Sequence, residues 1–377
     1  MNQLLKKELG FQGYVMTDWN AQHTTAQSAN TGLDMTMPGS DFNGNTQLWG
    51  SKLTQAVNSG QVQQSRIDDM VRRILAAWYL VGQDKSYPSI NINANVQGSH
   101  KTNIRAVARD GIVLLKNEGG TLPLKKPAKV GLVGSAAVVN PQGMNSCTDA
   151  GCNTGALGMG WGSGTASYAY FSAPADAIKA RAQKDGSQVA LSASDSTSGV
   201  SSAVNGADVA IVFITSDSGE GYIKVENNAG DRNNLDPWHN GNDLVKAVAA
   251  INKNVVVVVH SVGPVILETI LAQANVKAVV WAGLPSQENG NALVDVLYGD
   301  VAPSGKLPYT IAKSANDYGT TISQGDDSFS EGLFIDYRHF DKSNIAPRYE
   351  FGYGLCKYLL ALSSCLPNDS SSFHNSY

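Results

Sequence analysis

Three continuous apolar runs, rich in valine and isoleucine, place the strongest limit on what this chain can fold into. They lie at Val209–Thr215, Asn254–His260 and Val276–Ala282. A strand that is apolar on both faces has to be covered on both faces, which is typical of parallel strands in α/β proteins. Segments with helical spacing alternate with these runs, at Asn242–Ala250, Val265–Gln273 and Gln287–Leu297. The sequence therefore predicts a mostly parallel sheet with helices on both sides.

The first 82 residues show a second strand and helix alternation. Short apolar strands are expected at Tyr14–Thr17 and Leu33–Met37, and helices at Ala21–Asn30, Leu48–Ser59 and Ser65–Val81. Ser65, followed three residues later by Asp68, predicts a capping box at the start of the last helix. This order is typical of a parallel α/β unit.

The rest of the chain is divided by composition. A length of 377 residues predicts two or three domains. The polar segment 83–101 is interpreted as a linker, 102–310 as the domain that holds the apolar runs, 311–355 as a loop-rich segment and 356–377 as a disordered or aberrant tail. Within the second domain we expect a helix through Val107–Leu115, a strand at Lys129–Val133 and a long loop at Asn140–Thr165.

Charge and hydropathy exclude two classes of partner. The chain has 28 Lys+Arg against 32 Asp+Glu, a net charge of -4, so no basic surplus is present to neutralise a nucleic-acid backbone. No run of about 18 apolar residues occurs, so no membrane span is expected. The first residues lack the apolar core of a signal peptide. The low charged fraction of 16%, with many Gly, Ser, Asn and aromatic residues, nevertheless resembles that of a secreted fungal-type enzyme more than that of a cytosolic one.

The four cysteines are Cys147, Cys152, Cys356 and Cys365. The first two lie close together in a polar loop, where a small disulfide could close, and free thiols are the alternative. A zinc site would need tighter Cys pairs with a nearby His, so no metal site and no cofactor are expected.

Asp18 is the first candidate for chemistry. It follows a short apolar strand and precedes Trp19. The carboxyl ends of parallel strands form the active face of α/β folds, and an indole ring can stack on the apolar face of a sugar. The alternative is that Asp18 caps a helix that begins near Asn20.

The loop Ser216–Tyr222 is the second candidate, because it directly follows an apolar run. Glu220 lies between two glycines, which allow the backbone to present the carboxylate. Two carboxylates that meet across a cleft can hydrolyse a glycoside, one attacking the anomeric carbon and the other protonating the leaving oxygen. A flexible surface loop is the alternative.

Other residues give weaker signals. Trp49 and Trp161 could line a sugar site, although packing in a core or loop is at least as consistent with their positions. Structural roles are expected for Asp34, which could also face a barrel mouth, and for His23, His239 and His260.

Several motifs together resemble glycoside hydrolase family 3, and they extend over nearly all of residues 1–355. They are Gly10–Trp19, Gly32–Gly39, Val113–Asn117 with Leu122–Leu124, Gly160–Ala166, Ser218–Tyr222, Gly230–Leu235, Trp281–Glu288, Gly305–Pro308, Glu331–Arg338 and Tyr349–Leu355. The similarity is greatest to secreted fungal β-glucosidases. It implies that residues 1–82 are the C-terminal part of a (β/α)8-type barrel, that 102–310 form an α/β sandwich, and that 311–355 lead toward a fibronectin-III-like domain.

The resemblance also implies residue roles. Asp18 would be the nucleophile and Glu220 the general acid/base of a retaining β-glucosidase acting on β-glucosides, cellobiose and cello-oligosaccharides. Trp19, Trp49, Trp161 and Tyr222 would contact the sugar. Glu226 is a rival acid/base, and Glu220 is preferred because relatives keep a Glu within Gly-Glu-Gly-Tyr.

Two departures from the family pattern leave alternatives open. About six of eight barrel units would precede this chain, and Cys356 replaces the usual continuation after Leu355, so a fragment or truncated gene product is expected. The alternatives are a sugar-binding remnant without turnover and a related β-xylosidase. A nucleotide-binding protein is disfavoured because no glycine-rich GxGxxG follows a strand.

Overall fold

The computed structural model describes residues 1–40, 44–152, 154–321 and 327–356. The chain divides into two compact units, here called unit 1 (Met1–Asn95) and unit 2 (from Val96 on). Their boundary falls inside the predicted linker 83–101. Most of the predicted tail, with Cys365, lies outside the described residues.

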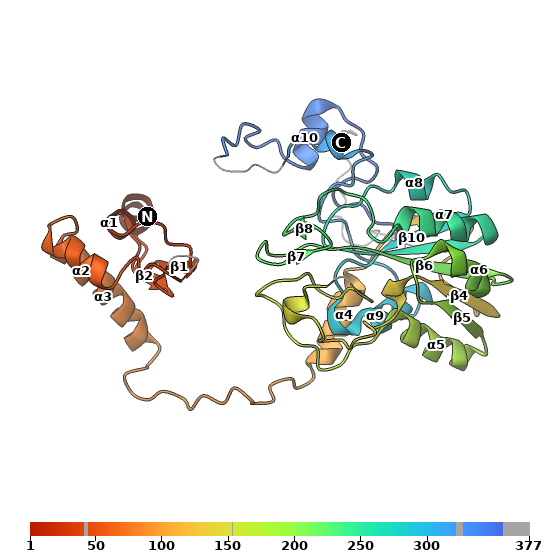
Figure 1. The fold of residues 1–377 in the computed structure, drawn as a ribbon, viewed down its shortest axis with the longest axis horizontal. Helices are drawn as coiled ribbons and strands as arrows, with labels where there is room; N and C mark the ends of the chain where they lie inside the picture. The colour runs from red at the N-terminus through yellow and green to blue at the C-terminus, as the bar shows by residue number, and fades with distance from the viewer. Residues whose placement is uncertain (41–43, 153, 322–326, 357–377) are drawn as a thin grey trace, which may run out of the picture. The chain divides into compact units, whose positions relative to one another are not determined.

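Unit 1 is a small α/β unit built on two parallel strands (Figure 1). β1 (Met16–Trp19) pairs with β2 (Met35–Met37), and the π-helical turn η1 (Asn2–Glu8) precedes them. The helices of this unit are α1 (Ala26–Thr31), α2 (Ser51–Asn58) and α3 (Gln64–Leu80). Because β1 and β2 run in the same direction, their carboxyl ends, and the side chains that follow them, share one edge.

The core of unit 1 is short. Its buried apolar residues are Ala29, Trp49, Ala56, Val62 and Met70. On α3 only Met70 is buried, while other apolar side chains of this helix, among them Val71 and Leu75, are exposed. The predicted capping box is wrong: α3 begins one residue before Ser65, and the Asp68 carboxylate accepts a hydrogen bond from the Gln64 amide instead.

Unit 2 contains a six-stranded sheet in the order β3-β10-β9-β6-β4-β5. Five strands are parallel and β3 is antiparallel to β10 at one edge. The strands are β3 (Val113–Asn117), β4 (Lys129–Val133), β5 (Gln188–Ser192), β6 (Val209–Ser216), β9 (Val255–Ser261) and β10 (Val276–Trp281). The predicted mostly parallel sheet is confirmed, and the three apolar runs are its central strands.

Helices cover both faces of this sheet, as Figure 1 shows for α5 and α9 on one side and α7 and α8 on the other. Side chains of β9 alternate between two cores: Val256 and Val258 lie in one, Val255 and Val257 in the other. The helices are α4 (His100–Asp110), α5 (Pro174–Asp185), α6 (Val200–Val204), α7 (Gly241–Ile251), α8 (Glu268–Leu271), α9 (Asn289–Leu297) and α10 (Tyr337–Ser343).

One predicted helix is wrong. The helix expected through Val107–Leu115 ends at Asp110, and Val113–Asn117 is strand β3. Gly111 follows the helix, and the next three side chains are fully buried against the sheet, an environment that selects a strand. Pairing with a neighbouring strand therefore outweighed the helical spacing.

The segment 311–355 belongs to unit 2. Ile311 and Tyr349 form an antiparallel bridge, and the Leu307 amide donates to the Tyr353 carbonyl. Leu307, Ile311 and Tyr349 are buried in the core that also holds Val255 and Val257 of β9. This segment closes one side of unit 2 by returning to the sheet.

Candidate active site

Asp18 lies in β1, one residue before its carboxyl end, with an exposed side chain. Its Oδ1 atom accepts the backbone N–H of Trp19 at 2.5 Å. The next helix, α1, begins only at Ala26 with Thr25 before it, so the helix-capping alternative is excluded. The carboxylate is left accessible at the edge where parallel strands usually present reactive groups.

The two predicted tryptophans of unit 1 have different environments. Trp19 is 62% exposed, as a stacking platform would be. Trp49 is 8% exposed, and its indole N–H donates to the Thr25 carbonyl at 3.2 Å inside the small core. The structure therefore gives Trp49 a packing role, the alternative that its position left open.

A buried ion network lies at the amino ends of β1 and β2, opposite the end that carries Asp18. Asp34 accepts from Lys6 Nζ at 2.6 Å, from Arg66 at 2.7 Å and from the Val15 N–H at 2.8 Å. Burial alone would raise the pKa of Asp34, but the hydrogen bonds from these three donors lower the pKa below its ordinary value. Asp34 is thus a structural anion that joins η1, the start of β1 and α3.

Glu220 lies in the loop after β6, and both of its carboxylate oxygens are held by one residue. The Ser163 N–H donates to Oε2 and the Ser163 hydroxyl to Oε1, each at 2.8 Å. The two donors fix the plane of the carboxylate and stabilise it when it is ionised. Sequence reasoning missed Ser163, because nothing local shows that residue 163 reaches residue 220.

Trp161 joins the two loops that meet at Glu220. Trp161 and Gly219 form a parallel bridge, and the Trp161 indole N–H donates to the Glu220 carbonyl at 3.1 Å. The approach is so close that a Cβ at Gly219 would lie 2.0 Å from the Trp161 carbonyl oxygen. Trp161 is 3% exposed, so its ring is not open to a ligand, and its contacts give it the role of positioning the Glu220 loop.

Tyr222 extends the same arrangement. Its hydroxyl donates to Asp149 Oδ2 at 2.7 Å, and half of its side chain is exposed. The hydrogen bond to Asp149, together with some burial, raises the pKa of Tyr222 to about 12. A phenol that stays neutral and half-exposed beside Glu220 can contact a ligand through its ring.

Glu226 is engaged elsewhere. Its Oε1 contacts His239 Nε2 at 2.6 Å, and His239 Nδ1 lies 3.5 Å from Asp195 Oδ2. Asp195 in turn accepts from the Ser135 hydroxyl. These groups line an open hollow that does not include Glu220, so the two candidate acids are held by different partners.

The remaining predicted residues have structural environments. Cys147 and Cys152 form a disulfide with their Cα atoms 5.9 Å apart, inside the long loop that carries Trp161 and Ser163. His260 is fully buried and its Nε2 donates to the Asn289 amide oxygen at 2.9 Å; burial lowers the pKa of His260 to about 4. In the described part of the chain, no group of three or more His, Cys, Asp or Glu side chains could hold a metal ion. None of the helices formed by the described residues combines the length and apolar character that a membrane span requires.

Each of the two units matches a domain model of the same protein family. Residues 1–77 match the Glycosyl hydrolase family 3 N terminal domain, and residues 112–356 match the Glycosyl hydrolase family 3 C-terminal domain. The chain belongs to glycoside hydrolase family 3, as its motifs indicated.

Curated relatives and solved structures agree with this assignment. The chain is 70% identical over 355 residues to "Beta-glucosidase cel3A" of Pyricularia oryzae, covering 94% of this chain and 49% of that protein. It is similar to the crystal structure of a beta-D-glucoside glucohydrolase from Trichoderma reesei, with 71% identity and a TM-score of 0.90 over 94% of this chain and 50% of that one. Beta-glucosidase D2-BGL from Chaetomella raphigera also gives a TM-score of 0.90, at 60% identity, over 94% of this chain and 51% of its own. The chain spans about half the length of these relatives.

Proposed function

We propose that this chain carries the two catalytic carboxylates of a retaining β-glucosidase. Asp18 acts as the nucleophile and Glu220 as the general acid/base. The observation that carries the proposal is the bidentate support of Glu220 by Ser163, at the carboxyl end of a central strand of the sheet. Relatives at 60–71% identity are named β-glucosidases or a glucoside glucohydrolase, which supports the same activity here.

The chemistry follows from two carboxyl groups in opposite protonation states. The Asp18 carboxylate attacks the anomeric carbon while the glycosidic C–O bond breaks, and the leaving oxygen takes the proton of Glu220. Glu220, now an anion, is stabilised by the two donors of Ser163. It then removes a proton from water, whose oxygen attacks the glycosyl–Asp18 ester and releases the sugar with retained configuration.

The substrate class is proposed from the site and the relatives. Trp19 and Tyr222 offer exposed rings for the apolar faces of sugars, which suits terminal β-D-glucosyl residues of cello-oligosaccharides or aryl glucosides. The Cys147–Cys152 disulfide favours an oxidising compartment, so we propose secretion. Glu226 is less suited to the acid role because His239 already holds its carboxylate.

The test is hydrolysis of two glucosides by the purified chain and its variants. Asp18→Asn should abolish cleavage of both an alkyl and a dinitrophenyl β-glucoside. Glu220→Gln should abolish cleavage of the alkyl glucoside, but should still release a single-turnover burst of dinitrophenolate, because that leaving group departs without a general acid while hydrolysis of the glycosyl–Asp18 ester still needs Glu220 as the base. Glu226→Gln is the matched control and should retain activity.

Three outcomes would change the assignment of residues or substrate. Equal rates for wild type and Asp18→Asn would remove Asp18 from the mechanism, and a loss confined to Glu226→Gln would transfer the acid role to Glu226. Faster cleavage of a xyloside than of a glucoside would favour a β-xylosidase.

A second candidate is a sugar-binding remnant without turnover. It is favoured by the exposed apolar side chains of unit 1, such as Met16 and Leu75, which unit 1 does not bury by itself. Sugar binding by the wild-type chain, with no hydrolysis by the wild type or by any of the three variants, would support this candidate.

A further inference from the structure

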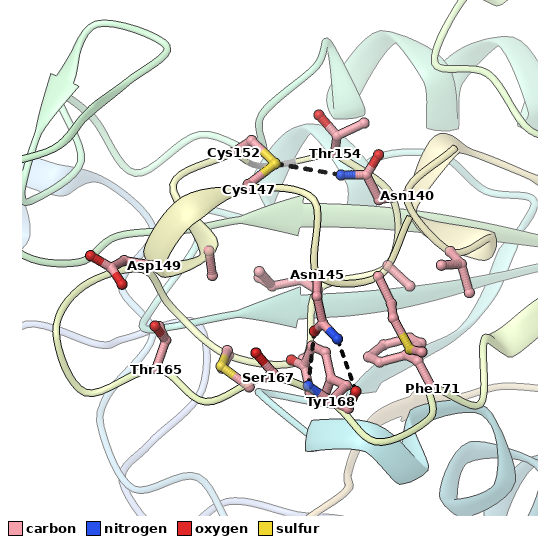
Figure 2. A pocket seen from close by; sticks show the side chains of 18 of the residues that line it. Asn140, Asn145, Cys147, Asp149, Cys152, Thr154, Thr165, Ser167, Tyr168 and Phe171 are labelled. Atoms are coloured by element: carbon pink, nitrogen blue, oxygen red, sulfur yellow. Dashed lines mark hydrogen bonds between the residues drawn. A yellow bond between two sulfur atoms is a disulfide. The ribbon is translucent and has the colours of Figure 1, made fainter. Parts of the chain in front are cut away.

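A cavity of about 190 Å³ lies within unit 2, under the loop closed by the Cys147–Cys152 disulfide (Figure 2). Segment 139–171 supplies nearly all of its wall, and Asp217, the first residue after β6, supplies the rest. Glu220 is not among the residues that line it. The side chains that bear on its chemistry are Asn140, Thr165, Ser167, Tyr168, Phe171 and Asp217.

Asp217 is the unusual group in this wall. None of its surface is exposed, and its Oδ1 accepts only the neighbouring Ser218 N–H at 2.9 Å. Its Oδ2 is buried and has no hydrogen-bond partner among the described residues. A buried carboxyl oxygen without a donor is costly, so it calls for an additional hydrogen-bonding group.

Nearby cations do not satisfy this carboxyl group. Arg232 lowers the pKa of Asp217 through its charge, but its Nη1 donates to the Pro264 carbonyl at 2.7 Å and the Ser216 hydroxyl at 3.3 Å. Burial raises the pKa of Asp217 to about 7 in spite of Arg232 and the Ser218 N–H. Near neutral pH the group is therefore populated in both forms, and either form accepts a hydrogen bond from a hydroxyl.

The rest of the wall narrows the class of ligand. The described residues of the lining include two carboxylates, Asp149 and Asp217, and no Lys or Arg, so an anion is disfavoured. Hydroxyl and amide groups alternate with the rings of Tyr168 and Phe171, a mixture that suits a molecule with both C–H faces and hydroxyl edges. The volume lies below the roughly 300 Å³ at which drug-sized sites begin, so one ring fits and two do not.

We propose that this cavity is a second binding site for a single neutral sugar ring or a polyol of similar size, with one ligand hydroxyl donating to Asp217 Oδ2. The site goes beyond the proposed function, because it is separate from the carboxylate of Glu220 and does not require turnover.

The experiment measures binding of D-glucose to the full chain by ligand-observed NMR, without any hydrolysis step. Asp217→Leu removes the acceptor while keeping a side chain branched at Cγ, and loss of a buried unpartnered carboxyl group should not impair folding. It should weaken binding about tenfold or more. Ser167→Trp, at the exposed rim, should block the cavity and also abolish binding.

Two variants serve as controls. Ser201→Trp places the same large ring on α6, on a residue that does not line the cavity, and should bind like wild type. Glu226→Gln should also bind like wild type, because Glu226 is not in the wall. Absence of saturable binding by the folded wild type would overturn the proposal.

Two other outcomes would overturn it as well. One is binding that survives both Asp217→Leu and Ser167→Trp, and the other is binding that Glu220→Gln abolishes, which would place the sugar at the catalytic carboxylate. Loss of hydrolysis in the preceding experiment with retained binding here would count against the proposed function alone.

Discussion

The two units are stabilised in different ways, unit 2 by large apolar cores and unit 1 by a small core with a buried ion network. Each unit carries one of the two proposed catalytic carboxylates. Unit 2 encloses its central strands between two apolar cores and holds Glu220 on loops cross-linked by Trp161 and Ser163. Unit 1 has two short strands and a small core, and a buried ion network joins its elements. A two-stranded sheet is marginal by itself, so unit 1 depends on polar contacts for its stability, whereas the sheet that precedes Glu220 depends on apolar packing.

Removal of Asp34 should have the largest effect, and it tests whether unit 1 depends on its polar contacts for stability. Asp34→Ala removes the buried partner of Lys6 and Arg66 and leaves them only Asp69, whose side chain is 32% exposed. The loss should cost about 3–5 kcal/mol in the free energy of unfolding of unit 1. Hydrogen exchange should show full exposure of β1 and β2 amides while β6 and β9 stay protected. Asp243→Ala is the control, because its pair with Lys246 is exposed and is worth about 0–1 kcal/mol. Protection of unit 1 in Asp34→Ala would show that its apolar core suffices.

The stability of unit 2 should depend on pH through two buried groups, Asp217 and His260, whose effects have opposite signs. Measuring this dependence sharpens the comparison between the units. The folded pKa of Asp217 is raised from 3.8 to about 7, so the stability that comes from its neutral form is lost as pH rises through that interval. The folded pKa of His260 is lowered from 6.5 to about 4, so the stability that comes from its neutral form is lost as pH falls through that interval.

Asp217→Leu should leave only the effect of His260. The free energy of unfolding of unit 2 should then rise with pH between about 4 and 6.5, by on the order of 1 kcal/mol per pH unit relative to wild type. Hydrogen exchange of β6 and β9 amides at several pH values measures it. His260→Gln should give the opposite slope, and identical slopes in all three proteins would refute the assignment.

The smallest expected effect tests the cross-link at Glu220. Ser163→Ala removes one of the two donors to the carboxylate and leaves the backbone N–H in place. We expect about a tenfold loss in kcat for an alkyl glucoside, with KM and the stability of unit 2 unchanged. A change in KM alone would make Ser163 a substrate-binding residue without influence on the acid.

Sequence reasoning succeeded where the pattern is local. The three apolar runs gave the central strands, and the position of Glu220 after one of them followed directly. It failed where the partner is distant: Ser163 reaches Glu220 only through the bridge between Trp161 and Gly219. The edge strand β5 was missed because its residues are half exposed, and β3 was predicted as a helix because its pairing partner lies more than 160 residues away.

The five consecutive valines of β9 have a consequence for how the sheet finds its alignment. Since both faces meet apolar cores, a slip by one residue would exchange valine for valine at most positions and cost little. The alignment information resides instead in the polar residues at the two ends. Asn254 holds the Asp208 carbonyl, and His260 meets Asn289 inside the protein. These two side chains therefore fix the register of β9. Replacing either with valine should permit strand pairings shifted by one residue, which the apolar run itself would not oppose.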